Sequence, residues 1–118
     1  MRQPPSIDAY GDGGFRVQGK RHDGSLLLLD DQPHVWPVNN LADLKPEDFA
    51  EVIAAGPGVS EFILLGTGAV MAPPSRAVKD AMRAAGLGLE FMSTEAAAKL
   101  YNVLATQGRR VAVALIAV

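Results

Sequence analysis

Hydrophobic positions change their spacing about two fifths of the way along the chain, and the change separates two kinds of predicted structure. In the first part, short apolar runs such as 15–18 and 25–30 are separated by Gly, Asp and Pro. This pattern is typical of β-strands joined by tight turns, and Asp23-Gly24 is a strong hairpin signal. Val35-Trp36 lies between two prolines, which favours an extended segment or an edge strand. We therefore expect an antiparallel β layer at the amino-terminal end.

From Pro46 onward, apolar residues follow a helical period that alternates with short, wholly apolar runs. Pro46-Glu47-Asp48 begins a helix that ends at Gly56, because proline fits the first turn and carboxylates stabilise the positive end of the helix dipole. The apolar runs predict three buried strands, at 61–65, 87–92 and 111–118. Amphipathic helices over 75–85 and 94–105 alternate with them.

The order from residue 61 onward is therefore β-α-β-α-β, which predicts an α/β fold. Helices of this length form crossover connections between parallel strands, and such connections are right-handed in about 98% of cases. The amino-terminal hairpins add antiparallel strands, so the sheet is expected to be mixed overall. At 118 residues the chain predicts a single domain over 1–118, with about the first six residues flexible.

Composition excludes several classes of function. The net charge of −2 provides no broad basic field, which argues against nucleic-acid binding. The absence of cysteine excludes disulfides, thiolate zinc sites and thiol catalysis. The longest apolar run, 111–118, is far shorter than the roughly 20 residues of a membrane-spanning helix, and the first residues lack the apolar core of a secretory signal. We expect a cytoplasmic protein that does not itself span a membrane.

The clearest candidate site is Gly66-Thr67-Gly68, which follows the predicted strand at 61–65. Open α/β sheets bind ligands at the carboxyl ends of their strands, and glycine lets the backbone approach closely. Free N–H groups in this loop would favour an anion, and Thr67 would add a hydroxyl. The third glycine of a dinucleotide fingerprint is absent, so no cofactor is predicted. The loop is interpreted either as a structural turn or as a shallow pocket for a small ligand or a peptide carboxylate.

Five other residues complete the candidate binding surface. Thr94 caps its predicted helix and would lie near the glycine-flanked loop. Tyr101 is expected to pack in the core, and Asn102 to form a hydrogen bond with a loop. Trp36, the single tryptophan, is either a lid over the core or an exposed anchor for a partner. Arg109 could supply positive charge, although parallel neighbouring strands would place it at the opposite end of the sheet from the loop.

Catalytic and metal-binding arrangements are poorly supported. No serine lies in a G-x-S-x-G turn, and no pair of carboxylates flanks the candidate loop. His22 and His34 occur among aspartates but lack the spacing of zinc ligands. We therefore predict no catalytic residue and no metal ligand, and an enzyme is the minority interpretation.

The chain resembles a small family of uncharacterised domains that includes mitochondrial complex I assembly factor 3 and the adipogenesis-associated domain protein of animals. The resemblance covers about residues 7 to 117. It is carried by an ordered set of short motifs: Gly13-Gly14-Phe15, Trp36-Pro37, Gly66-Thr67-Gly68, Thr94 with Ala97, Tyr101-Asn102, and Gly108-Arg109 before the run 111–116. The resemblance implies a compact three-layer α/β fold with a mixed sheet and an extra β hairpin. For the mitochondrial members it also implies a non-enzymatic role in assembling the respiratory NADH dehydrogenase with a partner assembly factor.

Three functions follow as hypotheses. The first is a non-enzymatic binding or assembly-type factor whose protein partner is an assembly factor or a membrane-complex subunit. The alternative is a small-molecule or anion-binding protein that uses the Gly66–Gly68 loop, with weak enzymatic activity at most. The third is a homo-oligomer in which the 111–118 strand forms a sheet edge and pairs between subunits. The oligomeric state is left open.

Overall fold

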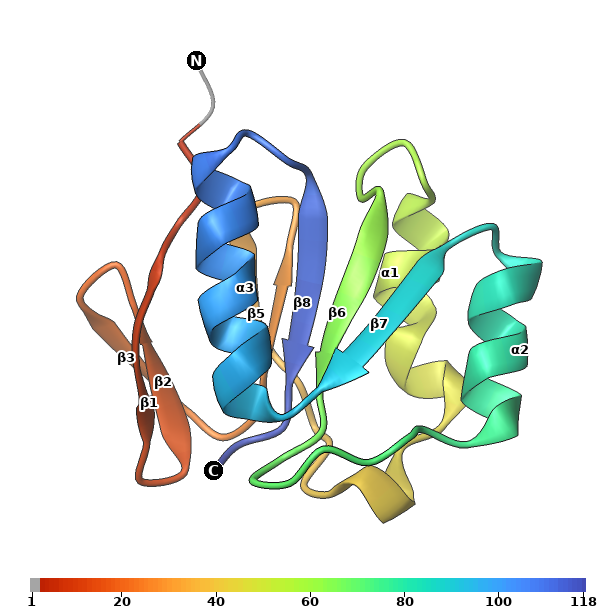
Figure 1. The fold of residues 1–118 in the computed structure, drawn as a ribbon, viewed down its shortest axis with the longest axis horizontal. Coiled ribbons are helices and arrows are strands. Elements are labelled where there is room, and N and C mark those ends of the chain that lie inside the picture. The colour runs from red at the N-terminus through yellow and green to blue at the C-terminus, as the bar shows by residue number, and fades with distance from the viewer. Residues whose placement is uncertain (1–2) are drawn as a thin grey trace.

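The strands form two separate sheets that pack against the same helix, α3 (Thr94–Thr106) (Figure 1). The structure is a computed structural model that describes residues 3–118. The smaller sheet is antiparallel and has the order β1-β2-β3, from β1 (Ile7–Gly11), β2 (Gly14–Val17) and β3 (Lys20–Asp23). The larger has the order β5-β4-β8-β6-β7, from β4 (Leu26–Leu29), β5 (Gln32–Val35), β6 (Phe62–Gly66), β7 (Gly88–Met92) and β8 (Val111–Leu115).

The larger sheet is mixed, as predicted. β6 lies between β7 and β8 and is parallel to both, whereas β4 is antiparallel to β8 and to β5. The predicted β-α-β-α-β order is confirmed, with α2 (Arg76–Ala84) joining β6 to β7 and α3 joining β7 to β8. The predicted helix that begins at Pro46 and ends at Gly56 is also present, as a 3-10 turn η2 (Pro46–Phe49) that continues into α1 (Ala50–Ala55). A further 3-10 turn, η1 (Leu41–Asp43), precedes it.

The expectation that the last strand forms a sheet edge is wrong. β8 lies at the centre of the sheet, with β4 on one side and β6 on the other. All five of its residues are buried, so this strand needs a covering layer on both faces and a paired strand on both sides. The two edges are instead β7 and β5, and β5 contains Pro33, which suits an edge position.

The prediction of a hairpin at Asp23-Gly24 is also wrong. Gly24 lies where the chain leaves β3 and enters β4 in the other sheet. The reason is burial: all four leucines of β4 are buried, whereas no residue of β3 is, so β4 pairs with β8 and not with β3. The observed hairpins turn at three two-residue loops whose φ angles lie between 48° and 80°, as type I′ turns require: Asp12-Gly13, Gln18-Gly19 and Asp30-Asp31.

The larger sheet separates two hydrophobic cores, which gives the fold its three layers. On one face, η2, α1 and α2 contribute Phe49, Val52 and Met82. On the other face, α3 and the smaller sheet contribute Tyr101 and Phe15, among others. In Figure 1 the smaller sheet lies beside α3 at the left of the view, and α2 lies beyond the β7 edge at the right.

A polar cluster on the surface joins β1 to α3. The hydroxyl of Tyr10 donates a hydrogen bond to Glu95 Oε1 at 2.8 Å, and Lys99 Nζ lies 3.0 Å from the same oxygen. The hydrogen bond from Tyr10, then the hydrogen bond from Lys99 and the charge of Lys99, lower the pKa of Glu95. A carboxyl whose pKa is lowered by folding stabilises the native state above its unfolded-state pKa, and this contribution is lost as the pH falls through the folded-state value.

We predict that Tyr10→Phe raises the pKa of Glu95 toward its ordinary value, because the largest cause of the lowering is removed. The measurement is an NMR titration of the Glu95 side-chain carboxyl carbon. Ser6→Ala is the control, since the Ser6 hydroxyl lowers the pKa of Asp8 instead and its loss should leave Glu95 unchanged. An unaltered Glu95 titration in Tyr10→Phe would contradict the assignment.

Candidate functional site

The Gly66–Gly68 loop leaves the carboxyl end of β6 and contacts the first residue of α3, Thr94. Gly66 pairs in register with Met92 of β7 and Leu115 of β8, so three parallel strands end together here. Thr94 lies against this edge, as predicted. Its Oγ1 donates a hydrogen bond to Ile116 O at 2.7 Å and accepts one from Gly68 N at 3.0 Å.

The helix cap is not the residue expected. Ser93, in an extended conformation, is the N-cap of α3, and its hydroxyl accepts a hydrogen bond from Ala96 N at 3.2 Å. Thr94 is the first residue of the helix, and its side chain is completely buried. Its hydroxyl therefore joins strand ends and does not cap the helix.

The expectation of a free hydroxyl and free amides in this loop is wrong. Thr67 is buried, and its amide donates to Met92 O at 2.8 Å. Thr67 Oγ1 lies 2.8 Å from Val70 O and 3.1 Å from Met92 O, and it accepts a hydrogen bond from Ala72 N. Because the hydroxyl has one proton, it donates to one of these carbonyls at a time. Buried polar groups need such partners, and the Thr67 hydroxyl and the Thr67 and Gly68 amides find theirs within the protein.

Gly66 permits a close approach, but the approach is to α3. A Cβ atom at this position would lie 2.8 Å from Leu115 Cδ2 and 2.9 Å from Thr94 Cα. Only a glycine allows the strand and the helix to meet at this distance. The Gly66-Thr67-Gly68 segment is thus buried against α3 and has a structural role.

The chain that follows forms an exposed apolar loop, Gly68–Pro74, which we call the 68–74 loop. It contains no charged residue, and the exposed fractions of Val70 and Met71 are 76% and 57%. Thr67 Oγ1 contacts both Val70 O and Ala72 N, which ties the tip of the loop to its base. Sequence reasoning missed this feature, although Val70-Met71 between Gly68 and Pro73 was an available signal, since turns are usually polar.

Tyr101 and Asn102 hold the amino-terminal segment against α3. Asn102 forms two hydrogen bonds with the backbone of Ile7, accepting from its N–H and donating to its carbonyl, both at 2.8 Å. The buried Tyr101 hydroxyl donates to Pro5 O at 2.9 Å. The expected core position of Tyr101 is confirmed, and the bonding partner of Asn102 is a strand, β1. Of the segment expected to be flexible, Met1 and Arg2 lie outside the described residues.

Trp36 and Arg109 lie away from the candidate loop. Trp36 is 3% exposed, its Nε1 donates to Asp48 O at 2.9 Å, and its ring packs on Phe49 with centroids 5.6 Å apart. It is therefore a lid over the core, and the anchor interpretation is wrong. Arg109 lies at the amino end of the parallel strands, where its Nε is 2.7 Å from Glu61 Oε2 and its guanidinium lies over the Phe62 ring.

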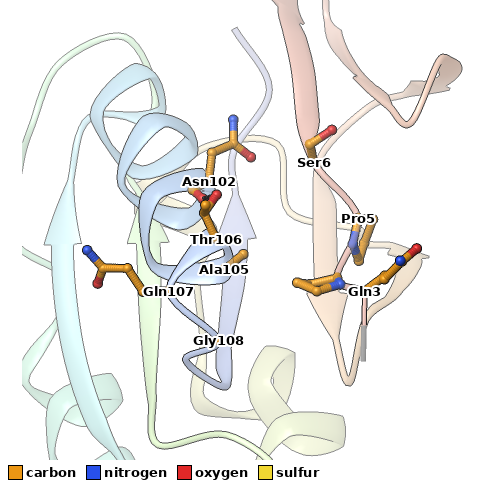
Figure 2. Close-up of a pocket in the computed structure, with 9 residues that line it drawn as sticks. Gln3, Pro5, Ser6, Asn102, Ala105, Thr106, Gln107 and Gly108 are labelled. Atoms are coloured by element: carbon orange, nitrogen blue, oxygen red, sulfur yellow. Dashed lines mark hydrogen bonds between the residues drawn. The ribbon is translucent and has the colours of Figure 1, made fainter. Parts of the chain in front are cut away.

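A hollow of about 520 Å³ lies between residues 3–6 and the carboxyl-terminal end of α3 (Figure 2). Asn102 lines it but is engaged with Ile7, and the Thr106 hydroxyl donates to Asn102 O. The side chains that line the hollow are uncharged: Gln3, Pro4, Pro5, Ser6, Asn102, Ala105, Thr106, Gln107 and Gly108. They offer hydrogen bonds but no group that would act as a general acid or base near neutral pH.

Within 3–118, no three His, Asp or Glu side chains are grouped so that they could hold a metal ion. None of the helices in this part of the chain has the length and apolar character needed to cross a bilayer.

Comparison with known proteins matches residues 7–116 to a family described as "Protein of unknown function (DUF498/DUF598)". An uncharacterised protein of Rhodobacter capsulatus is 37% identical over 93% of this chain and 82% of its own length. The NADH dehydrogenase [ubiquinone] 1 alpha subcomplex assembly factor 3 of Rattus norvegicus is 32% identical over 93% of this chain, which spans only 59% of that protein. A crystal structure from Bordetella parapertussis superposes with a TM-score of 0.87 at 30% identity, over 100% of this chain and 99% of its own. These matches confirm the resemblance stated from the sequence.

We predict that Thr94→Val destabilises the fold by about 2–4 kcal/mol, because it leaves the Gly68 N–H and the Ile116 carbonyl buried without partners. Urea unfolding measures the loss. Thr106→Val is the matched control, since its hydroxyl is exposed, and it should change stability by no more than about 0.5 kcal/mol. Equal unfolding midpoints for Thr94→Val and the wild type would contradict the role of this hydroxyl.

We also predict that Gly66→Ala costs about 1–3 kcal/mol, since the new methyl group overlaps with the Thr94 backbone and the Leu115 side chain. Gly58→Ala is the control, because a Cβ there meets open space and the backbone is not left-handed. It should be neutral or slightly stabilising. Thermal unfolding of the two variants distinguishes them, and a Gly66→Ala variant as stable as Gly58→Ala would refute the packing argument.

Proposed function

We propose that the chain, which belongs to the DUF498/DUF598 family, acts as a non-enzymatic, protein-binding factor in the assembly of a respiratory NADH dehydrogenase. The assembly role is named for the mammalian relative, of which this chain spans 59%. The partner we propose is a subunit of that membrane complex or a second assembly factor. We place this activity in the cytoplasm, the location expected from the sequence.

The 68–74 loop is the observation that carries the proposal. Val70 and Met71 expose most of their apolar surface to solvent, while the base of the loop is held by Thr67. Exposed apolar patches on soluble proteins mark interaction sites, and an ordered loop loses little conformational entropy on binding. Methionine suits such a surface because its flexible, polarizable side chain adapts to a partner.

The chemistry of the surrounding residues supports binding over catalysis. The hydroxyls of Thr67 and Thr94 and the Gly68 amide have partners within the fold. The small-molecule alternative depended on these groups being free, so it loses its physical basis. The surface that remains accessible beside them is apolar, which suits a protein partner.

We predict that Val70→Ser combined with Met71→Ser impairs assembly while the protein stays folded, because both side chains are exposed and make little contribution to the core. Loss of two interface side chains worth about 1–2 kcal/mol each lowers affinity by roughly 30- to 900-fold. The experiment deletes the gene in its native cell, restores it as wild type or variant, and measures assembled NADH dehydrogenase on native gels.

Val103→Ser is the matched control, since Val103 is an apolar residue of α3 with an exposed fraction of 52%. We expect deletion to lower the assembled complex, and the wild type and Val103→Ser to restore it, while the loop variant does not. An unchanged level of the complex after deletion would refute the assembly function. Full restoration by the loop variant would instead refute the role of the 68–74 loop alone.

A further inference from the structure

A groove of about 310 Å³ runs between α2 and β7 on the side of the molecule where β7 forms the edge of the larger sheet. Figure 1 shows α2 placed beyond this edge. The groove is lined by residues from both elements and the turn between them: Lys79, Met82, Arg83, Leu87, Gly88, Leu89 and Phe91.

The backbone of β7 can accept another strand. Met92 O accepts a hydrogen bond from Thr67 N, on the side that faces β6. Because backbone groups alternate along a strand, those of Leu89 and Phe91 point to the opposite, open side. Within residues 3–118 no strand pairs with this side of β7. An open edge of this kind is a template for an added strand.

The floor of the groove is apolar. Leu89 and Phe91 are half-buried and pack against the core that contains Met82, so their side chains face α2. Glu90 is exposed and, by alternation, faces the other side of the sheet. The Glu90 carboxylate therefore lies outside the groove, and the apolar surface inside the groove can contact a large side chain.

The rim of the groove is cationic. Arg76, Lys79 and Arg83 lie along one side of α2 with a single carboxylate, Asp80, among them. Asp80 lies 3.9 Å from Arg76 and 3.8 Å from Arg83, and such long, exposed ion pairs are weak. Lys79 Nζ lies 5.5 Å from the centre of the Phe91 ring, over the groove. This local excess of positive charge is opposite in sign to the net charge of the chain, which is −2.

We propose that the α2–β7 groove binds an extended acidic segment of a partner protein, which adds as a sixth strand to β7. A large apolar side chain of that segment packs on Met82, Leu89 and Phe91. Acidic side chains two positions away point to the same face and meet Lys79 and Arg83. A second copy of this chain fits less well, since two-fold pairing of β7 would bring two cationic α2 rims together.

This inference goes beyond the proposed function and does not depend on it, because the groove shares no residue with the 68–74 loop. The test uses the whole chain and an acetylated, amidated peptide, Glu-Thr-Phe-Thr-Glu, whose Glu and Phe side chains share one face. Two further peptides serve as probes of charge and of the apolar contact: Lys-Thr-Phe-Thr-Lys and Glu-Thr-Ser-Thr-Glu. Binding is measured by NMR titration and by hydrogen exchange of the β7 amides.

We expect the acidic Phe peptide to protect the Leu89 and Phe91 amides and to bind at least about tenfold more tightly than either probe peptide. Lys79→Glu combined with Arg83→Glu should reverse the preference toward the lysine peptide. Arg16→Glu combined with Lys20→Glu, on the smaller sheet, is the matched control for net charge and should leave the preference unchanged.

Strand addition is tested with two N-methylated forms of the acidic Phe peptide. One form is methylated on the backbone nitrogens of Glu and Phe, and the other on those of Thr. The N–H groups of only one of these two groups of residues can face β7, so one form should lose binding and the other keep it. Equal binding by both methylated peptides would overturn strand addition, as would equal binding by the acidic and lysine peptides. Protection of Leu89 and Phe91 that rises with protein concentration in the absence of peptide would show that a second copy occupies the edge instead.

Discussion

The carboxyl ends of the parallel strands depend on one buried hydroxyl. Thr94 Oγ1 donates to Ile116 at the end of β8 and accepts from Gly68 beyond the end of β6, and the Thr94 amide donates to Gly68 O. The first turn of α3 is therefore fixed to two strands at once. Because these groups are removed from water, each would be costly without its partner. This one junction therefore holds the start of α3 and the base of the 68–74 loop against the ends of the strands.

The junction also explains why the loop beside it can be apolar and still ordered. Loops usually gain order from polar side chains within the turn. Here Thr67, at the base, contacts the backbone of Val70 and Ala72, so the exposed residues need not supply hydrogen bonds themselves. The exposed side chains are consequently available for contact with another molecule.

Much of the fold was predictable from local pattern. β6, β8, α2 and α3 have strong apolar periodicity, and the structure places all four within a few residues of the expected ranges. β1 and β3 were missed because most of their residues are exposed and show no apolar alternation. These two strands exist through their pairing with β2, which sequence periodicity does not report.

The position of the candidate site could be predicted from the sequence, but the structural role of its residues could not. Gly66 was correctly expected to allow a close approach, yet its partner is Thr94, which lies 28 positions later in the chain. The role of Trp36 was also ambiguous, because its local sequence does not show whether the side chain is an exposed anchor or a buried lid. The α2–β7 groove was not found because it needs Lys79 and Phe91 to lie together, which only the tertiary fold determines. Local pattern therefore indicates where polar and apolar groups occur, and long-range packing decides which of them remain accessible.

The central position of β8 sets an order in which the domain can be built. Within residues 3–118, β8 is the strand that links the β4–β5 hairpin to the β6–β7 unit, and it follows all the other strands of this region in the chain. During synthesis, the β4 and β6 edges that pair with β8 stay unpaired until β8 leaves the ribosome. Closure of the sheet is thus a late, long-range event, and a nascent chain stalled before residue 111 is the form most exposed to aggregation and most in need of a chaperone.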